Sequence, residues 1–270
     1  MTDQPKRSRG RPRTQSDEGA TIQSLDRAIR VLQSLGDGEG RSLSELAADL
    51  KESPSTLYRV LTTLARHRMV EFQEGGQLWF IGIESFRIGS AFLGRTQLVE
   101  QARIVMRSLM AETGETANLG IGETREVIFI SQVETHEPIR AFFRPGTRGP
   151  IHSSGIGKAL LAHREAADVD RLFDDGPLPG FTDQTITAQA DLRAHLEAIR
   201  ATGWSVDNEE HTMGMRCIAA PIFNEFGEAI AGVSISGPSV RVRPERDGAL
   251  GARVSEAASA ITQAIGGRAP

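Results

Sequence analysis

The segment IHSSGIGKALL, residues 151–161, combines hydroxyl groups, glycines and a lysine at the start of an apolar run, which are residue types that can hold an anion. A nucleotide phosphate loop needs a glycine ahead of its Gly-Lys pair and a Ser or Thr after the lysine. Here Ser153 or His152 occupies the first place and Ala159 follows Lys158. The segment does not fit a nucleotide, but free N–H groups at the start of a helix can bind a smaller anion. The alternative is an ordinary helix start capped by Ser154.

Small polar residues farther along the chain could complete such an anion site. Ser234 and Ser236 are two apart in a strand pattern, so both hydroxyls project from one face. Cys217 begins the preceding strand pattern, and Asp207 lies just ahead of it. Hydroxyls, a carboxylate and helix N–H groups together suit a small oxo-acid. The alternative is that Cys217 is an ordinary buried thiol and that the two serines are ordinary strand residues without a ligand. The predicted binding residues are Gly155, Ile156, Asp207, Cys217, Ser234 and Ser236.

The sequence lacks the usual catalytic and metal-binding patterns. The chain has no G-x-S-x-G, no H-E-x-x-H and no C-x-x-C sequence. Asp207, His211 and Cys217 could form a metal site with His152, but their spacing suits no standard ligand pair. We therefore predict a protein that is not an enzyme, with no catalytic residues and no metal.

The composition limits the class of protein further. The chain has 270 residues and one cysteine, which excludes an intrachain disulfide and favours a reducing compartment. No apolar run approaches the roughly 20 residues that cross a bilayer, and no secretory signal is present. We expect a cytoplasmic protein that makes no contact with membranes.

The N-terminus carries positive charge on a chain whose net charge is −4. Residues 1–20 are polar and without apolar periodicity, which predicts a disordered basic arm. Its RGRPR sequence, residues 9–13, resembles the core of an AT-hook, in which arginines such as Arg9 and Arg11 enter a narrow minor groove. A basic tail that strengthens DNA binding without reading sequence is the alternative.

The pattern that follows predicts three short helices and a hairpin. The first helix places Ile22, Leu25, Ile29, Leu32 and Leu35 on one face. Ser42 and Glu45 have the spacing of a capping box, and Ser53 precedes Pro54 as a helix cap. A hairpin turning at Gly75-Gly76 then completes a winged helix-turn-helix. A three-helix bundle for protein contacts is the alternative. The DNA-binding residues predicted for the third helix are Ser55, Thr56, Tyr58, Arg59 and Arg66, with Tyr58 and Arg66 placed near phosphates.

The rest of the chain alternates strand and helix patterns with hairpin signals. We predict an α+β fold in which an antiparallel sheet forms the second domain. Strand patterns cover residues 117–122, 126–134, 139–144, 216–223 and 229–237, and helix patterns cover residues 155–163, 165–173, 189–202 and 246–265. The expected domains are 1–20 for the arm, 21–82 for the winged helix-turn-helix, 83–96 for a linker helix and 97–267 for ligand binding.

Five segments together resemble one protein family: SLDRAIRVLQSL, STLYRVLTTLARHRMVE, HSSGIGKALLA, EEHTMGMRCIAAPIF and SISGP. Over residues 22–266 the chain resembles the isocitrate-lyase-regulator (IclR) family of bacterial transcription factors. The resemblance implies a winged helix-turn-helix that binds a palindromic operator, a GAF-like effector domain, and a dimer or a dimer of dimers. No cofactor is implied besides the effector.

The glyoxylate- and pyruvate-responsive members of the family imply the effector site. Their ligand-binding positions fall on the six residues predicted above, so the expected effector is a small organic acid, with glyoxylate as first choice. In this family the segment before the loop supplies the apolar wall of the pocket. Here that segment, residues 137–151, departs from the family pattern. Ala141 and Gly149 would open the pocket wall, whereas Phe142, Phe143 and Arg148 would enter the pocket.

Two other functions fit the same residues. One is an enzyme acting on a 2-oxo acid with an appended DNA-binding module. The other is an architectural minor-groove binder whose second domain only oligomerises.

Overall fold

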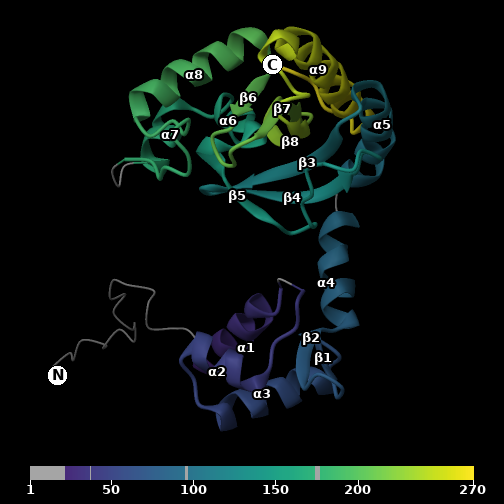
Figure 1. The fold of residues 1–270 in the computed structure, drawn as a ribbon, viewed down its shortest axis with the longest axis vertical. Helices are drawn as coiled ribbons and strands as arrows, with labels where there is room; N and C mark the ends of the chain where they lie inside the picture. Colours follow the sequence, from purple (N-terminus) through teal and green to yellow (C-terminus); the bar gives the residue numbers. More distant parts are fainter. Residues whose placement is uncertain (1–21, 37, 95–96, 174–176) are drawn as a thin grey trace, which may run out of the picture. The chain divides into compact units, whose positions relative to one another are not determined.

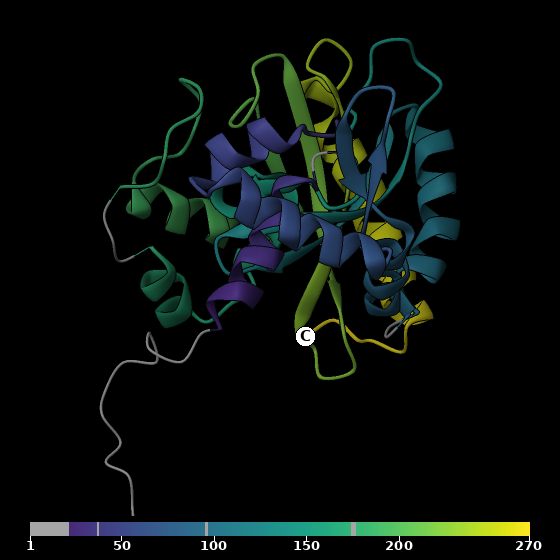
Figure 2. The same ribbon diagram turned by 90° about the horizontal axis from the view of Figure 1, so that it is seen from below.

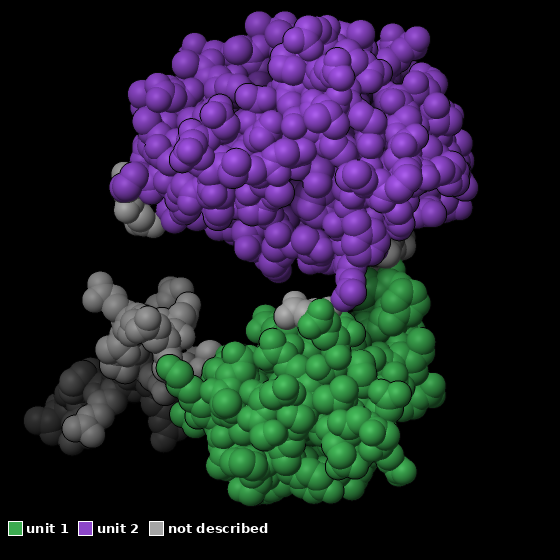
Figure 3. Space-filling view, viewed as in Figure 1, with its two compact units in different colours: residues 1–92 green, residues 93–270 purple. Residues whose placement is uncertain are grey.

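The computed structural model describes residues 22–36, 38–94, 97–173 and 177–270 (Figure 1). The predicted arm of residues 1–20, with Arg9 and Arg11, lies outside the described residues. The chain divides into two compact units, Met1–Phe92 and Leu93–Pro270, which Figure 3 distinguishes by colour. Each unit has its own hydrophobic core.

The described part of the first unit has the predicted helices and hairpin. These elements are α1 (Gln23–Ser34), α2 (Leu43–Leu50), α3 (Pro54–Arg66), β1 (Val70–Gln73) and β2 (Leu78–Ile81). Buried side chains from all of them form the core: Val31, Leu35, Leu46, Leu57, Leu61, Val70 and Trp79. An isolated bridge between Arg41 and Trp79 ties the segment before α2 to the hairpin. The winged helix-turn-helix prediction is confirmed.

Both predicted helix caps are present. The Ser42 N–H donates to Glu45 Oε2 at 2.7 Å, and the Glu45 N–H donates to Ser42 Oγ at 3.3 Å, which makes a reciprocal capping box. Ser53 Oγ accepts from the Thr56 N–H at 3.2 Å, and Pro54 takes the first helical position. These contacts fix where α2 and α3 begin.

The hairpin is confirmed, and it turns at Gly75-Gly76 as predicted, because these are the two central residues between Glu74 and Gln77. The residue after them, Gln77, has a left-handed backbone with φ of 54°. The Gln77 N–H and side-chain Nε2 both donate to the Glu74 carbonyl, at 3.3 and 3.2 Å. Those two bonds offset the cost of a left-handed residue that has a side chain.

The prediction for the buried face of α1 was wrong in part. Ile22, Leu25 and Ile29 are 66%, 56% and 46% exposed, whereas Val31 and Leu35 are buried against the core. The helix carries two neighbouring apolar stripes, and periodicity alone does not say which of them faces α3. The Ile22–Ile29 stripe is therefore an exposed apolar surface of this unit.

Helix α4 (Ile83–Gly94) follows the hairpin directly. The Glu84 N–H donates to the Arg68 carbonyl at 3.1 Å, and Ser85 Oγ donates to the Met69 carbonyl at 2.8 Å. The start of α4 is thus hydrogen-bonded to the segment between α3 and β1.

The described residues of the second unit form a six-stranded antiparallel sheet in the order β5-β4-β3-β8-β7-β6. The strands are β3 (Thr116–Glu123), β4 (Glu126–Val133), β5 (Arg148–Pro150), β6 (Ser205–Asn208), β7 (Met215–Phe223) and β8 (Ala229–Pro238). The helices are α5 (Leu98–Thr113), α6 (Gly155–Leu161), α7 (Ala166–Leu172), α8 (Gln189–Thr202) and α9 (Asp247–Ala264). The α+β prediction is confirmed.

Helices cover both faces of this sheet. Figures 1 and 2 show α7 and α8 on the opposite side of the sheet from α5 and α9. Strand residues such as Ile218, Val233 and Ile235 pack with α5 and α9 in one core. Ala219 joins the second core with α6 and α8. Because strand side chains alternate, each central strand supplies residues to both faces.

The strand predicted at residues 139–144 is absent, and this prediction was wrong. Pro138 and Pro145 flank the segment, and Gly146 has φ of 94°, so the backbone turns instead of continuing a ladder. Only Arg148–Pro150 joins the sheet here, as β5. The pattern also missed β5 and β6, which have 3 and 4 residues and are too short to show alternation.

Candidate functional site

The predicted binding residues of the sheet meet in two neighbouring cross-strand rows. In the first row, Cys217 of β7 pairs with Asp207 of β6 on one side and with Ser236 of β8 on the other. In the second row, Ser234 of β8 pairs with Ala219 of β7 and with Asn118 of β3. Residues directly opposite one another share a face. The four polar side chains predicted from the sequence therefore project from the same face of the sheet.

Helix α6 begins over these rows, as the loop sequence predicts. A Cβ atom added to Gly155 would lie 3.1 Å from Cys217 Sγ and 3.3 Å from the Ala219 methyl. Ser205 Oγ also donates to the Gly155 carbonyl at 2.6 Å. At Gly157 an added Cβ would lie 2.0 Å from the Ile151 carbonyl oxygen, a backbone clash. Both glycines are needed because the helix start lies so close to its neighbours.

The cap of α6 accounts for one of its N–H groups. Ser154 Oγ accepts from the Gly157 N–H at 3.2 Å, so the predicted alternative of a serine cap is present. The first two residues, Gly155 and Ile156, have no intrahelical acceptor for their N–H groups. The Ile156 side chain turns away from the polar rows, because it packs against Gly232 and Gly120. Only the backbone of Ile156 can therefore face a ligand.

Asp207 is a buried acid at the end of the first row. Burial raises its pKa from 3.8 to about 7, against the lowering effects of the Glu210 N–H and the Lys158 ammonium. The Glu210 N–H donates to Asp207 Oδ1 at 2.8 Å. Near neutral pH the side chain can therefore change its protonation state in response to a bound acid.

Cys217 is held as a neutral thiol. Burial, followed by the neighbouring Asp207 carboxylate, raises its pKa to about 11, while hydrogen bonds from Ser236 and Ser234 act in the opposite direction. A nucleophilic cysteine needs a lowered pKa. Cys217 is therefore suited to a role as a buried wall and weak hydrogen-bonding partner.

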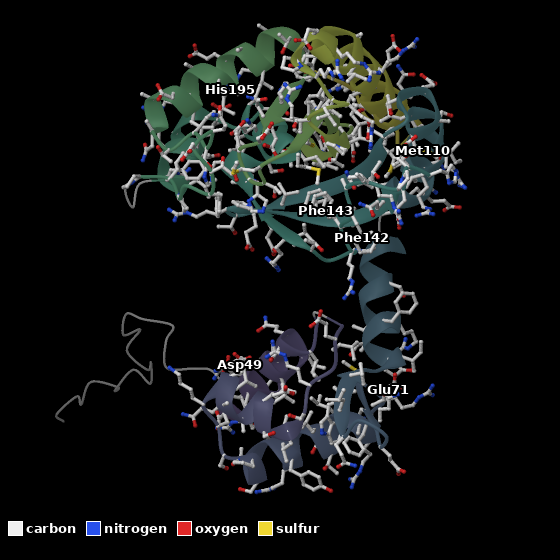
Figure 4. The ribbon with its side chains drawn as sticks, viewed as in Figure 1. Asp49, Glu71, Met110, Phe142, Phe143 and His195 are labelled. Atoms are coloured by element: carbon white, nitrogen blue, oxygen red, sulfur yellow. The ribbon has the colours of Figure 1, made fainter. Side chains whose placement is uncertain are left out.

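A buried ion pair that the sequence did not predict supports the first row. Lys158 of α6 is completely buried and bonds to Glu210 and to the Val206 carbonyl, the latter at 2.6 Å. Glu210 also holds Asp207 through its N–H. His195 of α8 (Figure 4) has a lowered pKa, because of burial and then the Lys158 charge. No sequence rule for an anion loop indicates that its lysine would turn inward.

Asn118 and Gln132 are polar residues of the second row that the sequence patterns did not indicate. Asn118 is completely buried and donates to Ser236 Oγ at 3.1 Å and to Ser234 Oγ at 3.5 Å. Gln132 Nε2 donates to Asn118 Oδ1 at 2.7 Å. A polar residue inside the otherwise apolar pattern TANLGIG is the signal that could have identified Asn118.

The segment before the loop does not enter the polar rows, contrary to the expectation for Phe142 and Arg148. Phe142 is 57% exposed, and Arg148 forms surface ion pairs with Glu126 and Glu123. Phe143, which lies with Phe142 between β4 and β5 (Figure 4), stacks on Phe129 with ring centroids 4.5 Å apart.

The two small residues of this segment have different positions. Ala141 is completely buried, and an added Cβ at Gly149 would lie 3.7 Å from the Phe129 ring. An alanine at position 149 would therefore make an ordinary van der Waals contact with the Phe129 ring.

The histidines of the suggested metal site have other partners. His152 Nε2 is 2.9 Å from the Pro179 carbonyl oxygen, and the His211 ring contacts Phe181. Among the described residues, no group of three or more His, Cys, Asp or Glu side chains is placed to hold a metal ion.

In the first unit, the residues predicted to contact DNA come from one helix. Ser55, Arg59 and Arg66 lie along one exposed stripe of α3, and Tyr58 beside them is 56% exposed. Thr56 is half-buried, and its hydroxyl accepts from Ser53 Oγ at 2.8 Å. Four of the five predicted side chains are thus open to a partner, while Thr56 takes part in the helix cap.

Arg59 also borders a hollow between α1 and α3. The hollow has a volume of about 490 Å³ and is lined on the α1 side by Ser24, Leu25 and Ala28. Arg59 therefore lies beside Leu25 of the exposed apolar stripe of α1.

The helices of the described residues are too short or too polar to span a lipid bilayer.

Comparisons with known proteins cover both units. Residues 24–74 match the family model of the IclR helix-turn-helix domain, and residues 90–263 match that of the bacterial transcriptional regulator IclR C-terminal region. The HTH-type transcriptional regulator BhcR of Paracoccus denitrificans is 49% identical over 261 residues, which cover 95% of this chain and 94% of that protein. The transcriptional repressor IclR of Escherichia coli is 37% identical, with 91% of each chain covered.

A solved structure agrees with these relatives. It is an IclR homolog from Microbacterium hydrocarbonoxydans complexed with 4-hydroxybenzoate, with a TM-score of 0.79 and 25% identity over 90% of this chain and 98% of that one. The winged helix-turn-helix, the α+β second unit and these matches lead to one assignment. The chain belongs to the IclR family of bacterial DNA-binding transcriptional regulators.

Proposed function

We propose that a small organic acid modulates the DNA binding of this regulator, with glyoxylate as the first choice. The observation that carries the proposal is the pair of buried polar rows, in which Asp207, Cys217, Ser234 and Ser236 share one face under the start of α6. Buried polar groups are costly unless they are hydrogen-bonded. A compact acid with a carboxylate and a carbonyl would satisfy the serine hydroxyls, Asp207 and the N–H groups of α6.

Two further observations support an organic acid as the effector. The solved relative named above is a complex with 4-hydroxybenzoate, which is also a carboxylic acid. The protonation of Asp207 near pH 7 would let the site accept an anion without two facing negative charges. The raised thiol pKa of Cys217 argues against an enzyme that would turn over a bound 2-oxo acid.

Calorimetric titration tests the effector directly. Saturable micromolar binding of glyoxylate is expected for the wild type, and Ser234→Ala should weaken it at least tenfold, since a hydrogen bond to a charged group contributes about 1.5–3 kcal/mol. Ser259→Ala on the exposed face of α9 is the matched control. Pyruvate, glycolate, succinate and protocatechuate complete the series.

Each outcome of that titration has a definite meaning. Binding of only the larger acids would replace glyoxylate as the effector. Turnover of a bound acid would favour the enzyme, and indifference to every acid would favour the architectural DNA binder.

For the DNA interface, we propose that α3 enters the major groove of a palindromic operator. Ser55, Thr56 and Arg59 would lie near base edges, with Tyr58 and Arg66 near phosphates. The capped start of α3 and its exposed polar stripe support this arrangement. A palindrome calls for a dimer or a dimer of dimers, and the exposed stripe of Ile22, Leu25 and Ile29 supports self-association.

Arg59→Ala is expected to weaken operator binding by about 1–3 kcal/mol and to relax the preference at one operator position. The measurement is a binding assay on an operator selected from random duplexes and on its single-base variants. Arg66→Ala should weaken all sequences equally and lower the salt dependence, because a phosphate contact carries no base preference. Arg107→Ala, on an exposed position of α5, is the control. An equal loss on every sequence for Arg59→Ala would assign that residue to a phosphate.

A further inference from the structure

Asn118 occupies the centre of the second polar row. It lies on β3 directly opposite Ser234 of β8 and opposite Gln132 of β4. It is completely buried, and its side chain hydrogen-bonds to side chains of this row and of the adjacent one. An amide in this position connects the outer part of the sheet face to the two serines of the proposed effector site.

The hydrogen bonds give this connection a direction. Gln132 Nε2 donates to Asn118 Oδ1 at 2.7 Å, which leaves the Asn118 NH₂ group facing the serines. That group donates to Ser236 Oγ at 3.1 Å and to Ser234 Oγ at 3.5 Å. Each serine has one hydroxyl proton to donate. Because both oxygens already accept from Asn118, both protons are directed elsewhere.

The neighbouring Cys217 offers these protons only a weak acceptor. Cys217 pairs with Ser236 and lies in the row next to Ser234, and sulfur is a poor acceptor. An oxygen of a bound acid would be a better acceptor for either proton. The two rows thus present two oriented donors, one from each serine, to a ligand oxygen.

We propose that Asn118, held in place by Gln132, is a positioning residue that sets Ser234 and Ser236 as donors and so favours a 2-oxo acid over the matching 2-hydroxy acid. The inference rests on the proposed effector function of the same site. A carbonyl oxygen only accepts hydrogen bonds, so it matches two donors. A ligand hydroxyl brings a proton of its own, which does not match two serines that are already directed as donors.

Gln132→Glu tests the direction of the chain without changing Asn118. An ionised glutamate only accepts hydrogen bonds, so the Asn118 amide is expected to turn its NH₂ group toward residue 132 and its oxygen toward the serines. The serine hydroxyls would then donate to Asn118. Gln132 is only partly buried, so the substitution is compatible with folding.

The readout is calorimetric affinity for glyoxylate and pyruvate, each compared with its hydroxy counterpart, glycolate or lactate. Gln132→Glu is expected to lower the affinity for the 2-oxo acid about tenfold and to move the oxo-to-hydroxy ratio toward one. All four ligands are monoanions, so the added charge weakens them equally and leaves their ratio unchanged. Gln184→Glu makes the same charge change at an exposed position and is the control.

Asn118→Asp and Gln132→Met complete the test. Asn118→Asp places an acceptor opposite both serines and should lose more affinity than Gln132→Glu. Gln132→Met removes the anchoring amide without adding a charge. Its affinity for the 2-oxo acids should lie between those of the wild type and of Gln132→Glu.

Two negative outcomes are distinguishable. If the wild type binds none of the 2-oxo acids, the proposed effector function fails. If the wild type binds, and Gln132→Glu keeps both its melting temperature and the wild-type oxo-to-hydroxy ratio, the positioning role of Asn118 is wrong.

Discussion

Lys158→Met is expected to lower the unfolding free energy of the second unit by about 3–5 kcal/mol, the cost of leaving one partner of a buried ion pair alone. Lys158 is completely buried and Glu210 is 3% exposed, so water cannot replace the lost ammonium. Glu210 Oε2 already lacks a hydrogen-bond partner among the described residues. Methionine has a similar length, so the effect of lost charge is larger than the effect of lost volume.

The measurement is urea unfolding followed by Trp204 fluorescence in a Trp79→Phe background, so that only the second unit reports. Adding Glu210→Gln to Lys158→Met should recover a large part of the loss, because the uncompensated charge is then removed. Arg193→Met, which breaks an exposed ion pair with Asp170, should cost about 1 kcal/mol or less. A Lys158→Met variant as stable as that control would show that Glu210 is solvated in solution.

Asp207→Asn is expected to stabilise the ligand-free protein at pH 8 and to weaken effector binding at least tenfold. Burial raises the pKa of Asp207 to about 7, so its ionisation at pH 8 is unfavourable in the folded state. Asparagine keeps an oxygen that can accept the Glu210 N–H, but it does not ionise. It also cannot offer the protonated carboxyl O–H that would donate to the ligand. A variant that is merely damaged would lose both stability and affinity.

The pH dependence follows from the sign of the pKa shift. The unfolded Asp207 loses its proton near pH 4, whereas the folded side chain keeps it until about pH 7. Over that window the folded state binds more protons, so this group lowers wild-type stability as pH rises. The gain from Asp207→Asn should therefore be absent below pH 4 and grow to an upper limit of about 4 kcal/mol at pH 8. Equal thermal shifts at pH 4 and pH 8 would contradict the raised pKa.

In the first unit, the sequence predicted those features that depend only on residues close together in the chain. The capping box at Ser42 and the serine cap before Pro54 depend on residues three positions apart, and both form as expected. The choice of buried face on α1 depends on packing against α3, which no window of sequence contains. Leu25 and Val31 belong to neighbouring stripes, and only the tertiary contacts decide which is buried.

In the candidate effector site, too, some features were predictable from nearby residues and others depend on contacts between distant ones. Alternation along β8 predicted that Ser234 and Ser236 share a face, and both the polar residue pattern and the family resemblance indicated that Asp207 and Gly155 join them. The roles of Lys158 and Asn118 depend on cross-strand register and on the direction of a buried side chain. These depend on contacts between residues 48 to 118 positions apart, beyond any local pattern.

The alternation in β7 and β8 also constrains how proteins built this way can diverge. Ser234 and Ser236 face the polar rows, while Val233 and Ile235 between them face the core under α5 and α9. Inserting or deleting one residue in β8 would exchange the two sets, placing hydroxyls in the core and branched aliphatics in the site. Point substitutions at alternate positions, by contrast, alter the ligand-facing side chains and leave the core intact. New effector preferences should thus accumulate through residue exchanges at constant strand length, with changes in chain length confined to the connecting loops.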